Sequence, residues 1–408
     1  MAGLMLWRSG GFRALWAGAA LSQLATPMLR FALPLIAVAE LGAGPWQIAV
    51  ISALGTLAFL LVGLPAGVLA DRVRQRRLLI WTDVGRAVLT AAVAVTTVAG
   101  LLGTGQLYLL ALAVGVLAVL FDVTHPSYLP QLVDRTQLVA ANGWLTAVLA
   151  IGQLVGPALA GALHAVLRAP GVLAVIAGGF AASALCLLMI TQPDRVPEAP
   201  ERRALGTEIA EGVRYVFGDP LLRPIVLAGA LINLCTLVIQ AIVLIYLVTD
   251  LRLTPEAAGL LFSAGGAGGI LGALVAEPLA RRVGRIRLLS RVMLVCGPFA
   301  LLIPGAGPGQ LALACAGYAM LWAGCSIFNV VQISVRQETC PPGMLGRMNA
   351  TFRFTLWGVM PLGGFLGGAL ATATGVRTTL WLGAAGITLA ALPVFTLHRR
   401  KNTVLPEH

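Results

Sequence analysis

Charged side chains inside apolar stretches are the residues of this chain best placed to do chemistry. Arg30 lies deep in the first such stretch. A charge near the middle of a bilayer costs at least about 3 kcal/mol, so it normally faces a cavity or pairs with a counter-ion. Asp83, Arg86, Asp122 and Glu277 lie in later stretches, nearer to the ends. Because burial moves the pKa of a carboxyl group toward neutrality, we predict these four as candidates for proton coupling, although Asp83 and Arg86 would also pair with each other.

Uncharged polar residues recur at helical spacing in several apolar stretches. Residues three, four or seven positions apart share one face of a helix, and such a face would line a common cavity. The alternative is that these side chains form hydrogen bonds between helices. The predicted cavity residues are Gln23, Thr26 and Arg30; Tyr108; Asn233, Thr236 and Gln240; and Tyr318, Trp322, Asn329 and Gln332.

The elements that carry these residues are predicted to be membrane-spanning helices. Of 408 residues, 58% are hydrophobic and 11% are charged, whereas soluble domains have about 25% charged residues. A span needs roughly 20 apolar residues, and the sequence contains twelve such stretches, at about 12–38, 46–70, 78–101, 106–124, 140–164, 171–191, 222–248, 257–279, 288–305, 309–334, 349–373 and 378–397. The predicted fold class is therefore an all-α integral membrane protein with twelve spans.

Basic residues favour the cytoplasmic side of a membrane protein. If the N-terminus is cytoplasmic, every Arg and Lys falls on a cytoplasmic segment or helix end except Arg30, Arg168, Arg252 and Arg377. This asymmetry predicts that both termini are cytoplasmic. It also accounts for the net charge of +12, so that nucleic acid is not an expected partner.

The spans fall into two sets of six. We predict an N-terminal six-helix bundle at 1–191, a cytoplasmic linker with an amphipathic helix at 192–221, a C-terminal six-helix bundle at 222–397 and a cytoplasmic tail at 398–408. The amphipathic helix is expected to lie on the membrane surface. The two halves repeat a local pattern, and internal duplication is typical of transporters that rock one half against the other.

The loop after the second stretch carries a recognisable pattern of glycine, acid and bases. It reads GVLADRVRQRR and resembles the loop signature of the major facilitator superfamily, which Gly67, Asp71, Arg72, Arg76 and Arg77 match. Arg74 and Gln75 depart from that signature. An aspartate at a helix end can pair with arginines or with a helix N-terminus. These residues, with Asp122, are therefore predicted to form a latch on the cytoplasmic side; the alternative is a solvated basic loop.

The fifth stretch, WLTAVLAIGQLVGPALAG, is rich in residues that disfavour a soluble helix. Gly143, Gly152, Gly156, Pro157 and Gly161 resemble the antiporter motif in the fifth helix of the same superfamily. That resemblance implies export. Glycines let helices approach closely, so we expect a packing face against a helix of the second half and a bend at Pro157. The alternative is a packing face without directional meaning.

The sequence texture resembles the bacterial exporter branch of this superfamily, which includes enterobactin and macrolide efflux proteins, over nearly the whole chain. The resemblance implies that helices 1, 4, 7 and 10 line the central cavity. One departure matters: drug–proton antiporters often carry an arginine in the fourth helix, and LYLLALAVGVLAVLFD has none. Their proton chemistry is therefore not implied here.

These patterns favour a secondary transporter that exports small amphiphilic molecules by alternating access, with proton antiport, as a monomer in the bacterial inner membrane. Its expected partners are a small-molecule substrate, protons and membrane lipids. An importer of a small anionic metabolite and a lipid flippase are the alternatives. No cofactor or metal is expected, because the six cysteines and four histidines lack ligand spacing. An enzyme is disfavoured because no span clusters His, Asp, Glu or Ser, and an ATP-driven pump because no phosphate-binding loop signature occurs.

Overall fold

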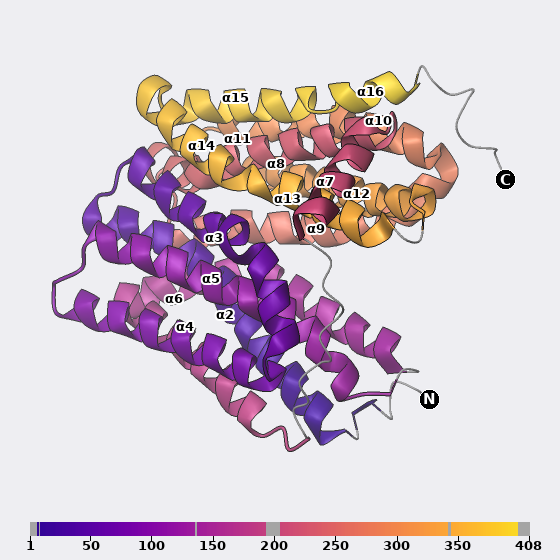
Figure 1. The fold of residues 1–408 in the computed structure, drawn as a ribbon. Coiled ribbons are helices and arrows are strands. Elements are labelled where there is room, and N and C mark those ends of the chain that lie inside the picture. The colour runs from indigo at the N-terminus through magenta and orange to yellow at the C-terminus, as the bar shows by residue number, and fades with distance from the viewer. Residues whose placement is uncertain (1–5, 8, 135–136, 193–204, 342–343, 399–408) are drawn as a thin grey trace. The chain divides into compact units, whose positions relative to one another are not determined.

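The structure, a computed structural model, describes residues 6–7, 9–134, 137–192, 205–341 and 344–398 (Figure 1). For residues 64, 67, 68, 70, 71, 139, 205–209, 345–346 and 396–398 it describes the backbone only. Within these ranges the regular structure is helical, and no strand occurs. The all-helical prediction is therefore confirmed.

Eleven helical segments of the described part are long and apolar enough to cross a membrane. The predicted number is twelve, and the difference lies in α6 (Leu138–Leu188), which contains both the fifth and the sixth predicted stretch. Arg168 interrupts α6 with φ 56° and ψ −175°, between the predicted ends at 164 and 171. Pro157 lies within helical backbone, and the non-helical break lies at Arg168.

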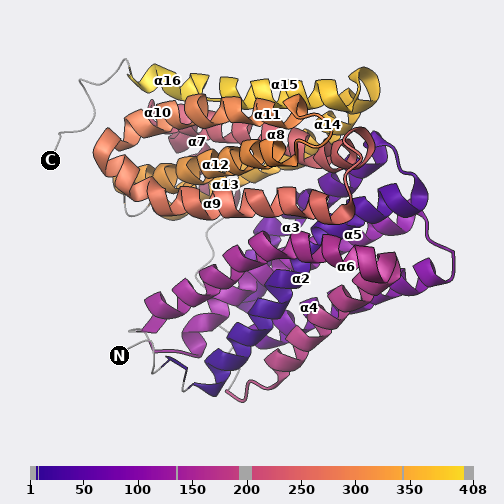
Figure 2. The same ribbon diagram turned by 180° about the vertical axis from the view of Figure 1, so that it is seen from behind.

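The chain divides into two compact units. Unit 1 comprises Met1–Pro200 and Leu253–Ser263. Its long helices are α2 (Gly10–Leu41), α3 (Pro45–Arg72), α4 (Gln75–Val98), α5 (Thr104–Tyr128), followed by the short η1 (Leu129–Gln131), and α6. Helix α2 packs most extensively against α6, α4 also contacts α6, and α3 contacts α5 (Figure 2). Helices α2, α4 and α6 therefore converge in the interior of this unit.

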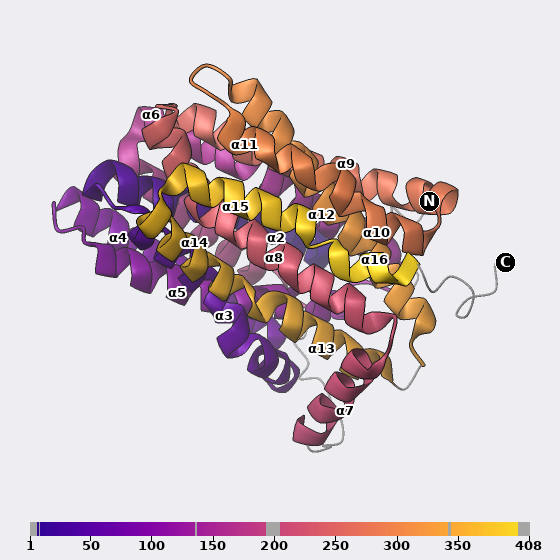
Figure 3. The ribbon, with the colours of Figure 1, turned by 90° about the horizontal axis from the view of Figure 1, so that it is seen from above.

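Unit 2 comprises Glu201–Arg252 and Ala264–His408. Helix α8 packs against both α14 and α15, and α12 packs against α10 (Figure 3). Helix α9 begins in unit 1 and continues into unit 2. The elements are α7 (Leu205–Gly218), α8 (Leu222–Ile245), η3 (Tyr246–Asp250), α9 (Pro255–Val283), α10 (Arg285–Cys296), η4 (Gly297–Leu301), α11 (Leu302–Gly305), α12 (Leu311–Thr339), α13 (Leu345–Gly358), α14 (Met360–Thr374), α15 (Val376–Leu389) and α16 (Leu392–His398).

The amphipathic linker helix α7 packs on protein. Gly212 of α7 lies so close to α13 that a Cβ atom there would come 2.6 Å from Thr351 Oγ1 and 2.7 Å from the carbonyl oxygen of Arg347. Glu211 forms an ion pair with Arg347, and Val216 is fully buried. Part of the apolar face of α7 that was expected on the membrane surface therefore covers α13.

Two glycines of the fifth stretch set the close approach of α6 to α2. A Cβ atom at Gly152 would overlap the carbonyl oxygen of Gln23, and one at Gly156 would lie 3.0 Å from Pro27 Cβ. The expected partner from the second half is therefore wrong for these two glycines. Gly161 contacts the backbone of Pro255, in the segment that groups with unit 1. A Cβ atom at Gly143 would have no heavy atom within 4 Å.

Candidate functional site

A buried acid and base face each other where α2, α4 and α6 converge. Asp83 and Arg86 form an ion pair, and their side chains are 0% and 2% exposed. Both lie in the middle third of the 24-residue helix α4, which corrects their placement near the end of the stretch. Arg30 is therefore not the only basic residue deep in a span. Because taking two charges out of water is costly, a buried ion pair often adds little net stability over apolar side chains of the same size.

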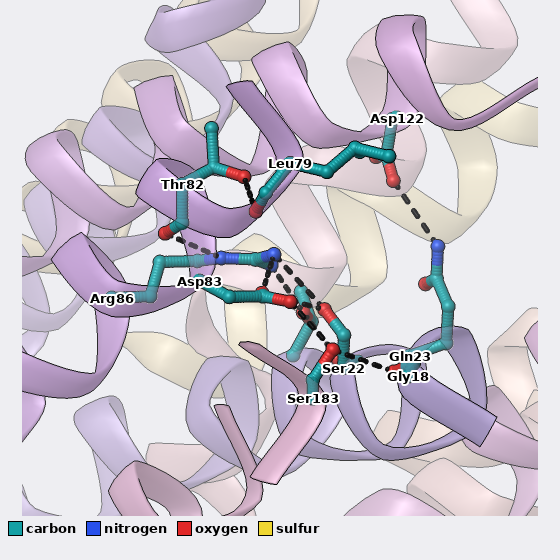
Figure 4. Close-up of polar contacts among 10 residues, drawn as sticks. Gly18, Ser22, Gln23, Leu79, Thr82, Asp83, Arg86, Asp122 and Ser183 are labelled. Carbon is teal, nitrogen blue, oxygen red and sulfur yellow. Dashed lines mark hydrogen bonds and ion pairs between the residues drawn. The ribbon is translucent and has the colours of Figure 1, made fainter. Parts of the chain in front are cut away.

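Hydrogen bonds between α2 and α4 and within α4 surround this ion pair (Figure 4). The Arg86 guanidinium donates to Ser22 Oγ at 2.9 Å, to Thr26 Oγ1 at 3.2 Å and to the carbonyl oxygen of Thr82 at 3.4 Å. Ser22 in turn donates to Asp83 Oδ1 at 3.2 Å. Because nearly every donor and acceptor has a partner, the cluster holds α2 and α4 in one register.

Two aromatic rings complete the surroundings of the arginine. The Arg86 guanidinium carbon lies 4.7 Å from the centre of the Phe121 ring and 4.6 Å from that of Phe180. Phe121 comes from α5 and Phe180 from α6. Each ring face attracts a cation, by up to about 2 kcal/mol when water is excluded. All four long helices around the cluster therefore contribute to holding this charge.

A polar face of α2 runs from the cluster toward more open surroundings. Gln23 donates to Asp122 Oδ1 on α5 at 3.2 Å, and Asp122 is exposed. Arg30 is also exposed, and the charges of both Asp122 and Arg30 act on Arg86. Within the described residues, Arg30 takes part in none of the hydrogen bonds or ion pairs. The structure thus joins the predicted cavity residues Gln23 and Thr26 to the predicted coupling residues of α4 and α5.

Tyr108, the remaining predicted cavity residue of unit 1, and the arginines of the predicted latch take no part in the hydrogen bonds described for this cluster, whereas Asp122 of the latch accepts from Gln23. Tyr108 is half-buried on α5. Arg76 donates to the carbonyl oxygens of Leu187 at 3.0 Å and Leu188 at 2.6 Å, which caps the end of α6. Arg72 and Arg77 are exposed. The side chains of Gly67 and Asp71 lie outside the described residues, although their backbone belongs to α3.

The predicted cavity residues of unit 2 make contacts mainly among themselves and with their own unit. Tyr318 and Trp322 form an edge-to-face pair with ring centres 6.2 Å apart. Gln332 donates to Asn329 Oδ1 at 3.0 Å. The other three lie on α8: Asn233 donates to the carbonyl oxygen of Leu356 at 2.8 Å, Thr236 Oγ1 lies 3.9 Å from Cys325 Sγ, and Gln240 is half-buried.

The Asp83–Arg86 pair of unit 1 has no charged counterpart at the two aligned positions of unit 2. If the loop after α9 is aligned with the loop after α3 so that Arg281 stands opposite Asp71, Met293 stands opposite Asp83 and Cys296 opposite Arg86. Met293 and Cys296 are buried, like their counterparts. Glu277 forms an ion pair with Arg281 at 2.9 Å, and both side chains are largely exposed. The Glu277–Arg281 pair therefore resembles a surface ion pair, whereas the Asp83–Arg86 pair is enclosed.

Sequence reasoning did not identify Ser183, Phe121 and Phe180 as part of this site. Ser183 of α6 is fully buried, and its Oγ lies 2.5 Å from Asp83 Oδ2. A single serine in an apolar stretch gives a weak signal, because such hydroxyl groups commonly bond to their own helix. Only the packing of α6 against α4 shows that this hydroxyl faces a carboxyl group.

Apolar helices of membrane-spanning length and ionisable groups enclosed between them define a class: a multi-pass membrane protein with a functional polar interior. The comparison with known proteins identifies the family. The chain matches the Major Facilitator Superfamily over residues 15–360 and again over residues 226–407, and it belongs to that superfamily.

Two kinds of relative extend this result. The chain is 28% identical to the multidrug efflux pump Tap of Mycolicibacterium fortuitum, over 81% of this chain and 82% of Tap. It is 26% identical to the enterobactin exporter EntS of Salmonella typhimurium, over 90% of this chain and 86% of EntS. Among solved structures, a bacterial homologue of the iron transporter ferroportin superposes with a TM-score of 0.77 at 18% identity, over 95% of this chain and 98% of that one. The predicted superfamily and its efflux branch are therefore confirmed.

Proposed function

We propose that this protein exports small amphiphilic molecules across the bacterial inner membrane by alternating access, driven by proton antiport. In this proposal both termini are cytoplasmic, and two six-helix bundles, 1–191 and 222–397, are joined by the linker 192–221. The efflux activity named for Tap and EntS supports the direction of transport. The enclosed Asp83–Arg86 pair beside the polar face of α2 is the observation that carries the coupling.

The proposed roles of these residues follow from how exposed their side chains are. Arg30, Gln23 and Asp122 lie in more open surroundings, so they are proposed to contact the substrate. Asp83 is enclosed, so it is proposed to carry the proton. Arg86 bonds to Asp83 on one side and, on the other, to Thr26, which shares the predicted polar face of α2 with Gln23 and Arg30. A change of protonation at Asp83 would thereby reach the substrate face of α2.

Removal of the Arg30 side chain should lower efflux while leaving the thermal stability of the protein nearly unchanged. Replacing Arg30 by alanine is expected to lower efflux about tenfold or more, equivalent to about 1.4 kcal/mol, while the melting temperature of the purified protein changes little. The physical reason is that the exposed guanidinium bonds to none of the described residues, so its removal leaves no described partner unsatisfied. The measurement is efflux of ethidium and of enterobactin from proteoliposomes under an imposed pH gradient.

The matched control is Arg13→Ala, because Arg13 is exposed near the start of the same helix. That variant should export like the wild type, and Arg30→Lys should retain part of the activity. Wild-type efflux from Arg30→Ala would remove Arg30 from the substrate site. Accumulation of either probe inside cells that carry the protein, instead of its depletion, would contradict export. Transport of labelled lipid in the same vesicles, without transport of the probes, would favour a flippase.

A further inference from the structure

The hydroxyl group of Ser183 lies between two hydrogen-bond acceptors. Ser183 Oγ is 2.7 Å from the carbonyl oxygen of Gly18 on α2 and 2.5 Å from Asp83 Oδ2 on α4 (Figure 4). Ser183 is fully buried on α6. One side chain of α6 thus touches a backbone acceptor of α2 and a titratable group of α4.

The number of protons decides which of these two contacts is a hydrogen bond. A serine hydroxyl has one proton to donate and can also accept. If Asp83 is ionised, the carboxylate oxygen and the Gly18 carbonyl compete for that single proton, and one close oxygen–oxygen contact has none. If Asp83 carries a proton on Oδ2, it donates to Ser183, and Ser183 donates to Gly18. The protonated acid satisfies both contacts at once.

The other carboxyl oxygen is compatible with this arrangement. Asp83 Oδ1 accepts from Arg86 and from Ser22, and a carbonyl oxygen can accept two hydrogen bonds. Arg86 is the charged group that acts directly on Asp83. Asp122 of α5 and Arg30 of α2 interact electrostatically with Arg86. The arginine therefore keeps its carboxyl partner in both protonation states, while the contact through Ser183 changes.

We propose that Ser183 is a positioning residue that converts the protonation state of Asp83 into a change of contact between α6 and α2. With Asp83 protonated, the Ser183 hydroxyl donates to Gly18 and fastens α6 to α2. When Asp83 loses its proton, the carboxylate takes the Ser183 hydrogen bond and the Gly18 carbonyl loses its side-chain donor. This inference rests on the proposed proton coupling and names the residue that transmits it.

The packing around Gly18 shows why one hydrogen bond matters at this point. A Cβ atom at Gly18 would lie 3.2 Å from the carbonyl oxygen of Ser183 and 3.3 Å from its Oγ. On the segment of α6 before the break at Arg168, Gly152 and Gly156 also come against the backbone of α2. Since α2 also carries the polar face with Arg30, a change of its contact with α6 would alter the exposure of that face.

A vibrational experiment tests the hydrogen-bond chain without any substrate. Infrared difference spectra of the purified protein in lipid nanodiscs, between acidic and alkaline buffer, should show the carbonyl stretch of one enclosed protonated carboxyl group. The band should disappear in Asp83→Asn. It should move to higher frequency in Ser183→Ala, because the acid loses its acceptor, and by a smaller amount in Ser183→Cys, because a thiol is a weaker partner of similar size. Ser127→Ala, at an exposed site on α5, is the control and should leave the band unchanged.

The second arm measures coupling. In proteoliposomes, Ser183→Ala should reduce the dependence of ethidium efflux on the pH gradient about fivefold or more, the usual size of an energetic coupling, while efflux down a large ethidium gradient persists. A band that is unchanged in Ser183→Ala would overturn the inference, even if the protein exports. A shifted band with no efflux of either probe would instead remove the proposed function and leave the hydrogen-bond chain standing. If Ser183→Ala does not fold, Ser183→Cys decides both arms.

Discussion

Replacing Asp83 by leucine is expected to destabilise the protein by about 3–5 kcal/mol, because the change leaves a buried guanidinium without its carboxyl partner. Arg86 is 2% exposed and cannot lose its charge in a protein. The variant also removes the acceptor of Ser22 and one acceptor of Ser183. Thermal unfolding in detergent, compared with the wild type, measures this effect.

The double variant Asp83→Leu/Arg86→Leu distinguishes the effect of losing the whole ion pair from the effect of losing one partner. Apolar replacement of a whole buried ion pair is often neutral or stabilising, whereas removal of one partner is costly. We therefore expect the double variant to recover most of the lost stability while efflux remains absent. A double variant as unstable as Asp83→Leu would show that the pair is not the source of the loss. Recovery of efflux would remove the pair from the coupling mechanism.

Replacing Gly152 by leucine is expected to separate α6 from α2 and to cost about 3 kcal/mol, at the upper end of the usual range for an overpacked interior. Any side chain at this position meets the carbonyl oxygen of Gln23, which belongs to backbone and cannot rotate away. Gly18 lies on the same helix as Gln23, so a displacement of α2 would also disturb the contact of Gly18 with Ser183, which belongs to the segment of α6 after Arg168. Efflux should fall below detection while membrane insertion persists, as measured by the amount of protein extracted from membranes.

Gly178→Leu is the matched control. Gly178 also lies on α6, is exposed, and a Cβ atom there would have no heavy atom within 4 Å. It should insert, melt and export like the wild type. Gly156→Leu should fall between the two, because its Cβ atom would be 3.0 Å from the side chain of Pro27 instead of overlapping backbone. Equal effects of the leucine at positions 152 and 178 would mean that close approach of α6 to α2 is not required.

The loop from Gly67 to Arg77 shows what local sequence can and cannot predict. The pattern from Gly67 to Arg77 identifies the superfamily because its residue types occur at fixed spacing within one loop. The structure gives Arg76 a specific partner, the end of α6, that no local pattern contains. Spacing along the chain thus identifies a family, whereas a partner more than a hundred residues away depends on which helices pack together.

The spans and the superfamily were determined by the sequence alone, because length and apolarity decide whether a helix can cross a bilayer and local motifs decide the family. Even the division of α6 at Arg168 falls where the apolar stretches leave a gap.

The polar interior was decided by tertiary structure. Asp83 looked like an acid near a helix end, and Ser183 like an ordinary serine of an apolar helix. Only the approach of α2, α4 and the segment of α6 after Arg168, which Gly18 permits, encloses the pair and brings Ser183 to it. The physical reason is that desolvation and hydrogen-bond competition depend on neighbours in space, and those neighbours come from three helices far apart in the chain.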